Sequence, residues 1–196
     1  TPVSGSREAF DSAYALHCAA CHGHNGVNGA ARPLNDPLYL SITPPSAFAA
    51  ATAHGSGVLM PPFGTHEGGP LDAAAIKTFV DSVYTFWGTG SSKPVAAPLY
   101  ASTEGDPLLG ATAFESWCGA CHGADGALEG HSVVDPFYLQ LVSEQAVRSA
   151  IIFGRPSLGM PSYQGPFPDK GEAHLDAATT NDITAWLLQR RAEAMQ

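Results

Sequence analysis

The chain of 196 residues repeats itself once, and this repetition constrains what it can fold into. The stretch LHCAACHGHNG (residues 16–26) has a counterpart 100 positions later in SWCGACHGADG (residues 116–126). Three further pairs follow in the same order: NDPLYL with VDPFYL, GVLMPPF with SLGMPSY, and LDAAAIKTFV with LDAATTNDITAWL. The last pair comes after a longer loop in the second copy and includes a three-residue insertion. Four matched anchors in the same order predict a duplicated domain.

The segment between the two copies has a different composition. Residues 88–106, GTGSSKPVAAPLYASTEGD, are rich in Gly, Ser, Pro and Ala, which is typical of a linker. We therefore predict a first domain over residues 1–90, a linker over 91–106 and a second domain over 107–196.

Each copy is predicted to contain three main helices. The first ends at the cysteine motif, with mainly apolar residues at helical spacing: Phe10, Ala13, Tyr14 and His17, then Leu109, Ala113, Phe114 and Trp117. The middle helices are expected to begin at Pro45-Ser46 and Ser143-Glu144 and to end at Gly55 and Gly154. The last helices carry the apolar positions Ile76, Phe79, Val80, Val83 and Trp87, then Ile183, Trp186 and Leu187. Because no segment alternates convincingly as a strand would, we predict an all-α fold.

Charge and hydropathy argue against several classes of partner. The formal net charge is −9 and no basic stripe or patch occurs, which argues against nucleic-acid binding. No stretch approaches the ~20 consecutive apolar residues that a membrane span needs. The sequence starts at Thr1 rather than at an initiator Met, so we expect that an N-terminal signal or anchor was removed.

All four cysteines lie in the two Cys-x-x-Cys-His motifs, which leaves none for a disulfide framework. Three kinds of site use such a pair. A redox dithiol belongs in a strand-rich αβ fold. A zinc site needs four ligands in one cluster; the four cysteines of both domains could supply them together, but this would leave the His after each pair unexplained. The third is covalent attachment of c-type haem, with two thioethers and a His ligand to iron. Two matches, each ending an amphipathic helix, favour this third interpretation.

A sixth ligand to iron is available in each copy. Met60 follows His22 by 38 residues, and Met160 follows His122 by the same number. Both methionines precede a proline in a Gly/Pro-rich loop, whereas Met195, the third methionine, stands at the C-terminal end. Met often fills gaps in apolar cores. The equal spacing favours iron ligation, since His and Met together hold the haem iron of many electron carriers.

Outside the linker, the chain resembles a tandem dihaem class I cytochrome c. This resemblance implies two covalently bound haem c groups and a small helical shell around each. It implies that the first and last helices cross near three pairs of positions: Phe10/Gly110, Tyr14/Phe114 and Phe79/Trp186. It also implies thioether anchors at Cys18, Cys21, Cys118 and Cys121, proximal ligands His22 and His122, and distal ligands Met60 and Met160.

One feature departs from that family. Its members usually have a proline about a dozen residues after the proximal His, and the carbonyl of this proline accepts the ring N–H. Pro33 fits this role in the first copy, but the second copy reads GHSVVDP there and has no proline before Pro136. A backbone carbonyl can still supply the acceptor that a His ligand needs. We predict that the two haems differ in ligand-field detail and in potential.

Two other residues stand close to the expected ligands. His54 precedes Met60 by six residues and is a rival distal ligand, but its aligned partner is Phe153, so packing or exposure is the favoured interpretation. Arg155 stands shortly before Met160, and its fork of donors suits a haem propionate. Solvent exposure is an equally good interpretation for Arg155.

The expected function is electron transfer rather than catalysis. Iron held by His and Met has no open position for a substrate. The expected partners are redox proteins: a respiratory or photosynthetic donor such as a quinol-oxidising membrane complex or a dehydrogenase, and an oxidase, reductase or reaction centre as acceptor. The alternatives are a redox subunit of a larger complex and a dihaem enzyme, such as a peroxidase or a sulfur-compound dehydrogenase. Covalent haem c implies a periplasmic or otherwise extracytoplasmic location.

Overall fold

The computed structural model describes residues 5–88, 90, 94, 96–101 and 104–194. Within these residues the chain is helical and forms isolated bridges but no strand, which confirms the all-α prediction. Contacts divide the chain into two compact units, Thr1–Gly55 with Met60–Val95 and Ser56–Leu59 with Ala96–Gln196. The predicted linker lies partly outside the described residues. Met195 also lies outside them. No helix in the described part of the chain has both the length and the apolar character needed to cross a bilayer.

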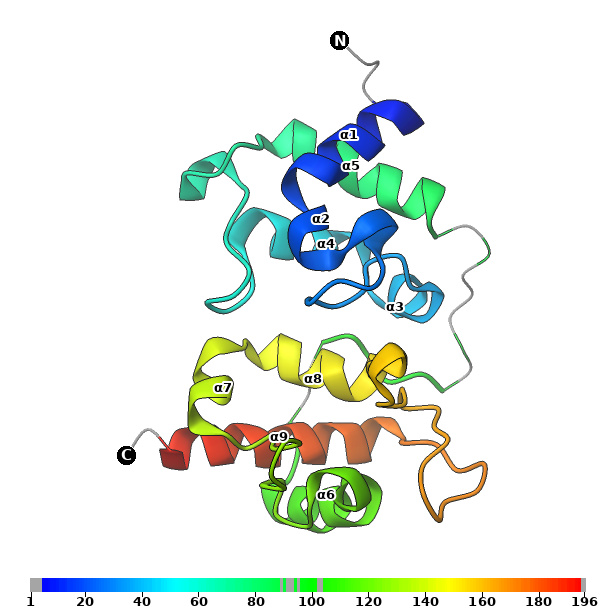
Figure 1. The fold of residues 1–196 in the computed structure, drawn as a ribbon, viewed down its shortest axis with the longest axis vertical. Helices are drawn as coiled ribbons and strands as arrows, with labels where there is room; N and C mark the ends of the chain where they lie inside the picture. Colours follow the sequence, from blue (N-terminus) through cyan, green and yellow to red (C-terminus); the bar gives the residue numbers. More distant parts are fainter. Residues whose placement is uncertain (1–4, 89, 91–93, 95, 102–103, 195–196) are drawn as a thin grey trace. The chain divides into compact units, whose positions relative to one another are not determined.

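The first unit is built around three of its helices. α1 and α4 both pack against α5 (Figure 1). A break at Cys18 separates α1 from the single turn that carries Cys21 and His22. The helices of this unit are α1 Arg7–His17, α2 Ala19–His22, α3 Pro37–Ile42, α4 Pro45–His54 and α5 Ala73–Phe86, with the 3₁₀ turns η1 His24–Gly26 and η2 Thr65–Glu67.

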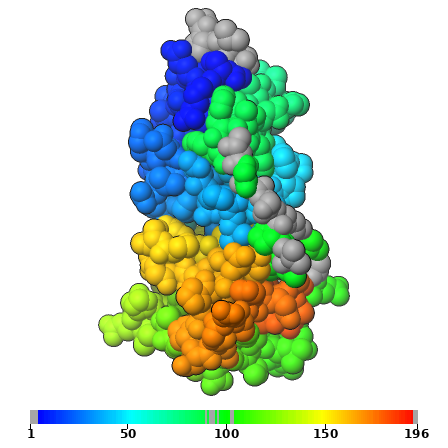
Figure 2. Space-filling view, turned by 90° about the vertical axis from the view of Figure 1, so that its right-hand side faces the viewer, coloured from blue at the N-terminus to red at the C-terminus, as the bar shows by residue number. Residues whose placement is uncertain are grey.

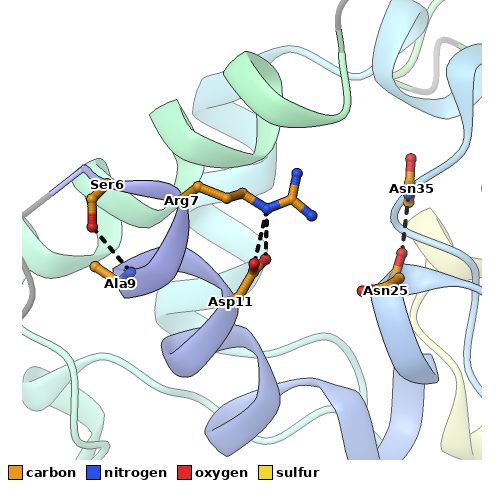
Figure 3. Close-up of polar contacts among 6 residues, drawn as sticks. All are labelled: Ser6, Arg7, Ala9, Asp11, Asn25 and Asn35. Carbon is orange, nitrogen blue, oxygen red and sulfur yellow. Dashed lines mark hydrogen bonds and ion pairs between the residues drawn. The ribbon is translucent and has the colours of Figure 1, made fainter.

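Local polar contacts define the start of α1. The Ser6 hydroxyl accepts a hydrogen bond from the Ala9 N–H at 3.1 Å, which caps the helix (Figure 3). One turn later Arg7 pairs with Asp11 at 2.8 Å on the exposed face. In the loop after the cysteine motif, the Asn35 side chain donates to the Asn25 carbonyl at 3.1 Å (Figure 3). These contacts set local conformation, while the core provides most of the packing.

An aromatic cluster joins α1 to α5. The Phe10 ring lies 5.6 Å from the Phe79 ring and 4.9 Å from the Trp87 ring, between centroids. The Tyr14 ring stacks edge-on against Trp87 at 5.0 Å, and its hydroxyl donates to the Gly23 carbonyl at 2.8 Å. The crossing expected at Phe10, Tyr14 and Phe79 is confirmed, and it ties the helix before the cysteine motif to the last helix of the unit.

The second unit has a closer helix crossing. A side chain at Gly110 would collide with the Asp182 carbonyl oxygen and lie 2.9 Å from Trp186 Cβ, so only glycine lets α6 approach α9 here. The Phe114 and Trp186 rings lie 4.4 Å apart at the same crossing. The elements of this unit are α6 Pro107–His122, α7 Pro136–Leu141, α8 Glu144–Phe153, η3 Pro156–Leu158 and α9 Ala177–Ala194.

The middle helices lie where the sequence predicts them. α4 begins at Pro45, and α8 begins after Ser143, whose hydroxyl accepts a hydrogen bond from the Ala146 N–H at 3.1 Å. Gly55 and Gly154 end these helices with φ values of +77° and +61°. Both lie in the region that favours glycine, which accounts for their place at the ends of the helices.

Two features differ from the sequence prediction. The short helices α3 and α7 were missed, although each begins with Asp-Pro and each Asp side chain caps its helix: Asp36 accepts from Tyr39 N at 2.7 Å and Asp135 from Tyr138 N at 2.8 Å.

The alignment of Phe79 with Trp186 is also wrong as a structural equivalence. A Cβ built at Gly26 would lie 3.0 Å from Trp87, and one at Gly126 would lie 3.3 Å from Trp186. Trp87, at the end of α5, is therefore the counterpart of Trp186. The two tryptophans stand at different places along their helices, since Trp87 follows the end of α5 and Trp186 lies in the interior of α9.

Candidate functional site

A cavity of about 430 Å³ lies inside the second unit. Its walls come from α6, α7, α8, α9 and the loops between them, and its lining includes Cys118, Cys121, His122 and Met160. The volume falls in the ~300–1,000 Å³ range of cofactor sites. The fold thus brings together the four residues expected around the second haem. Two thiols, one imidazole and one thioether around a largely apolar cavity form a donor set that fits a covalently held haem.

A backbone carbonyl orients the histidine of each motif. The Nδ1 atom of His122 lies 2.7 Å from the carbonyl oxygen of His131, and that of His22 lies 2.7 Å from the carbonyl oxygen of Arg32. When Nδ1 donates to a carbonyl, Nε2 keeps its lone pair for a metal ion. Both histidines are therefore held as a haem ligand requires.

The prediction that the Pro33 carbonyl accepts the hydrogen bond from His22 is wrong by one residue. The carbonyl that meets His22 belongs to Arg32, and Pro33 follows it. Pro33 disfavours helical backbone at Arg32, and this restricts where the Arg32 carbonyl points. In the second unit Ser132 follows the acceptor residue His131, so the missing proline does not remove the acceptor.

The environment of the thiols argues against a reactive dithiol. Burial and the adjacent Cys21 raise the pKa of Cys18 to about 12. Burial and the adjacent Cys121 likewise raise the pKa of Cys118 to about 12. Reactive cysteine pairs show the opposite shift, toward the thiolate. No cluster of three His, Cys, Asp or Glu suited to a metal ion occurs among the residues that the structure describes, which argues against a zinc site there.

Backbone contacts hold the methionine loop of the second unit. The Arg155 N–H donates to the Met160 carbonyl at 2.9 Å, and the Met160 N–H donates to the Arg155 carbonyl at 3.2 Å. Gly154 packs against this loop so closely that a Cβ there would lie 2.6 Å from the Met160 carbonyl oxygen. Arg155 also lines the cavity, consistent with its expected position near the haem. The loop conformation thus positions Met160 at the cavity wall.

The first unit presents the matching elements. Cys18 closes α1, while Cys21 and His22 lie in α2. Burial lowers the pKa of His22, which favours the neutral imidazole that a metal ion binds. Met60 follows Gly55, and a Cβ at Gly55 would collide with the Met60 carbonyl oxygen. In both units, therefore, the glycine that ends the middle helix lies against the loop that carries the methionine.

A separate cavity of about 520 Å³ lies between α4, η2 and α5 of the first unit. His54 lines it, and its Nδ1 lies 3.3 Å from Glu67 Oε1. Cys18, His22 and Met60 are not among its lining residues. His54 therefore faces a different space from the one expected for the haem, which supports the interpretation that it is not a ligand.

The sequence prediction missed part of the wall of the 430 Å³ cavity. Phe167 and Pro168, in the long loop before α9, both line it. The sequence shows that this loop is longer than its counterpart, but spacing alone does not show which way the loop folds. Its aromatic and proline residues, in an otherwise polar segment, were the available signal.

Comparison with known proteins supports part of this interpretation. Residues 7–80 match the family model described as Cytochrome C oxidase, cbb3-type, subunit III. Among solved structures, a chain of the reducing HAO-like protein complex of Kuenenia stuttgartiensis is similar with a TM-score of 0.53. The match covers 97% of this chain and 99% of that chain at 19% identity, which indicates a shared fold alone. No curated protein matches. Taken with the geometry, the family match supports a cytochrome c, which implies covalently bound haem c and electron transfer.

Proposed function

We propose that this chain is a dihaem electron carrier with one haem c in each repeat. Cys18 and Cys21 anchor the first group, with His22 and Met60 as iron ligands. The corresponding residues for the second group are Cys118, Cys121, His122 and Met160. The observation that carries the proposal is the 430 Å³ cavity, because it gathers the whole second set from elements far apart in the sequence.

Each part of the site has a physical role in this proposal. The bound haem c supplies a one-electron couple between ferric and ferrous iron. The His131 carbonyl orients His122, and the loop of residues 155–160 presents Met160. Met160 as a ligand would raise the potential relative to a second His and would leave no open position for a substrate. The largely apolar wall excludes water, so electron exchange needs little rearrangement.

We further propose that this carrier functions outside the cytoplasmic membrane, between redox proteins. Transient redox complexes are small, often below ~1,200 Å² of buried surface. The acidic chain, with a net charge of −9, suits partners that present a basic docking face. Proposed donors are a quinol-oxidising membrane complex or a dehydrogenase, and the proposed acceptor is a terminal oxidase, a reductase or a reaction centre.

The test is a matched pair of ligand variants in the holoprotein. The intact mass should first show two haems per chain. Met60→Ala should then open the first iron and Met160→Ala the second, each lowering one potential and leaving the other unchanged. Absorption spectra with carbon monoxide would report the opened iron. Rapid carbon monoxide binding by the native protein would instead favour a dihaem enzyme, and unchanged ligand spectra in either variant would refute that ligand.

A second candidate is a permanently docked redox subunit. It is favoured by the fold likeness to a chain of a multi-protein complex, although 19% identity extends only to the fold. Both candidates transfer electrons, so spectra do not separate them. Purification of the native protein under mild conditions does: a carrier elutes at the mass of one 20.3 kDa chain or a small oligomer, and a subunit elutes with its partners.

A further inference from the structure

The loop between the methionine and the last helix differs between the two repeats. Residues 164–174 fill this place in the second unit, and the counterpart, residues 64–70, is four residues shorter. Both loops are closed in the same way, by Leu71 N–H donating to the Phe63 carbonyl at 2.8 Å and Leu175 N–H to the Tyr163 carbonyl at 2.9 Å. The two loops thus begin and end at equivalent positions, and the loop of the second unit contains four additional residues.

The inserted loop packs against the end of α6, next to the first cysteine of the motif. The Phe167 and Trp117 rings meet edge-on with centroids 5.2 Å apart. Lys170 Nζ lies 5.0 Å from the Trp117 ring centroid and donates to the Ser116 hydroxyl at 2.6 Å. At the loop's ends, His174 Nδ1 lies 2.8 Å from the Gln164 carbonyl. The loop is therefore held against α6 by an aromatic, a cationic and a hydrogen-bonding contact.

The same loop forms part of the cavity wall. Phe167 and Pro168 line the cavity together with Trp117 and Cys118. On the outer side, the loop belongs to the orange part of the molecular surface (Figure 2). It therefore separates the cavity from solvent beside the cysteine that anchors the haem.

The first unit is built differently at this place. His17 stands where Trp117 stands, and its ring lies 6.0 Å from Phe63 of the methionine loop. The neighbouring Leu16 is exposed, as is its counterpart Ser116 in the second unit. The shorter loop of residues 64–70, GTHEGGP, contains no counterpart of Phe167 or Lys170. The two sites thus differ in which residues lie beside the first cysteine: a long loop with Phe167 packs there in the second unit, and His17 with Phe63 in the first.

We propose that residues 164–174 are a fixed cover over the edge of the second haem, and that they direct electron exchange with external molecules to the first haem. This inference rests on the proposed function and adds to it which of the two haems external molecules reach first. An apolar cover keeps both water and redox partners away from the haem edge. Burial is also one of the ways in which a protein tunes haem potential, because a dry surrounding disfavours the more highly charged ferric state.

The test measures the access of small oxidants to each haem in the holoprotein. A Met60→His background marks the first haem, since the change of ligand shifts its spectrum. Oxidation of the reduced protein is followed by stopped flow with an anion, hexacyanoferrate(III), and with a cation, tris(phenanthroline)cobalt(III). Phe167→Ala should raise the rate constant of the second haem several-fold with both reagents and lower its potential. The first haem should be unchanged.

A matched control is Phe137→Ala, which removes an aromatic ring that is 78% exposed and outside the cavity lining. It should change neither rate. A second variant exchanges residues 164–174 for GTHEGGP, the loop of the first unit, and should give a larger increase than Phe167→Ala. Should the exchanged protein not bind haem, Phe167→Ala decides alone.

Three outcomes would overturn the proposal that this loop covers the haem edge. The first is an unchanged rate of the second haem in Phe167→Ala. The second is a change of opposite sign with the anion and the cation, which reports charge rather than access. The third is a native second haem that already reacts as fast as the first. A native protein with fewer than two haems would contradict the proposed function itself, and its mass would show this before any rate is measured.

Discussion

His122 and His131 are joined by a contact of 2.7 Å between the ring Nδ1 and a backbone carbonyl oxygen. The first unit has the same contact between His22 and Arg32, also at 2.7 Å. Only the first unit has a proline after the acceptor residue. The hydrogen bond itself is thus independent of proline, and Pro33 contributes rigidity rather than the acceptor.

Pro33→Ser, which copies the second unit, should keep His22 ligated and lower the stability of the first domain. The reason is that the unfolded chain gains freedom when proline is removed, at a cost of about 0.4–1 kcal/mol in the free energy of unfolding. Urea unfolding followed by the absorbance of the first haem measures this change. Ser132→Ala is the control and should have a smaller effect. Loss of His22 ligation in Pro33→Ser would show that the proline does more than stiffen the loop.

The two haems should titrate with different reduction potentials. Their surroundings differ at three matched positions: Pro33 against Ser132, Phe63 against Tyr163, and His17 against Trp117. Polarity and solvent exposure around the iron are among the factors that set haem potential. A spectroelectrochemical titration should therefore fit two one-electron steps that are resolved from each other. A single potential for both haems would mean that these differences have no effect on the iron.

Gly154→Ala should weaken the bond between Met160 and iron. A Cβ at this position would collide with the Pro161 carbonyl oxygen and lie 2.6 Å from that of Met160, so the methionine loop must shift. Loss of the methionine-to-iron absorption band of the ferric protein measures the effect.

Gly159→Ala is the matched control for this prediction. Gly159 has φ of +82°, against +61° for Gly154, but a Cβ there would meet no atom within 4 Å. Both variants carry the cost of a positive φ, which is larger at Gly154 because its ψ of −162° is adopted almost only by glycine, whereas Gly159 is left-handed with ψ of 1°. Only Gly154→Ala adds the collision. Equal effects on the absorption band would place the cause in backbone strain and not in the contact with the loop.

Arg148→Met should destabilise the second domain far more than an exposed arginine variant. Arg148 is 1% exposed, and its guanidinium donates to the Leu99 and Tyr100 carbonyls and, at 2.6 Å, to Asn181 Oδ1. Methionine keeps the apolar stem but leaves these part-buried acceptors without their donor, at a cost of about 1–3 kcal/mol. Urea unfolding of the second domain measures the loss.

Arg7→Met is the control for this variant, because the Arg7–Asp11 pair is exposed and joins residues four apart on one helix. Such pairs contribute about 0.3–0.5 kcal/mol, so the unfolding midpoint of the first domain should change little. Equal losses in the two variants would mean that the contacts of Arg148 contribute no more than a surface ion pair.

The sequence predicted the parts of this protein that depend on short-range patterns. Cys-x-x-Cys-His is a local motif, because one helical turn carries its cysteines and its histidine. The spacing of 38 residues from His122 to Met160, repeated in the first copy, predicted that these two residues belong to one site, and both line the 430 Å³ cavity. The same prediction for His22 and Met60 stays a prediction. The helix ends at Gly55 and Gly154 were also predictable, since glycine there relieves a backbone constraint. The helices α3 and α7 were predictable as well, from their Asp-Pro starts, although they were missed.

The tertiary structure decided what depends on contacts between distant segments. The acceptor for His22 proved to be Arg32 and not Pro33, because the direction of a carbonyl depends on the path of the loop. Trp87 proved to be the counterpart of Trp186, because the packing of the helices, rather than the aligned letters, determines which ring lies against Gly26 or Gly126. The long loop before α9 folds back onto Trp117 through Phe167 and Lys170. Spacing along the chain records none of these contacts, since each forms only when separate elements pack together.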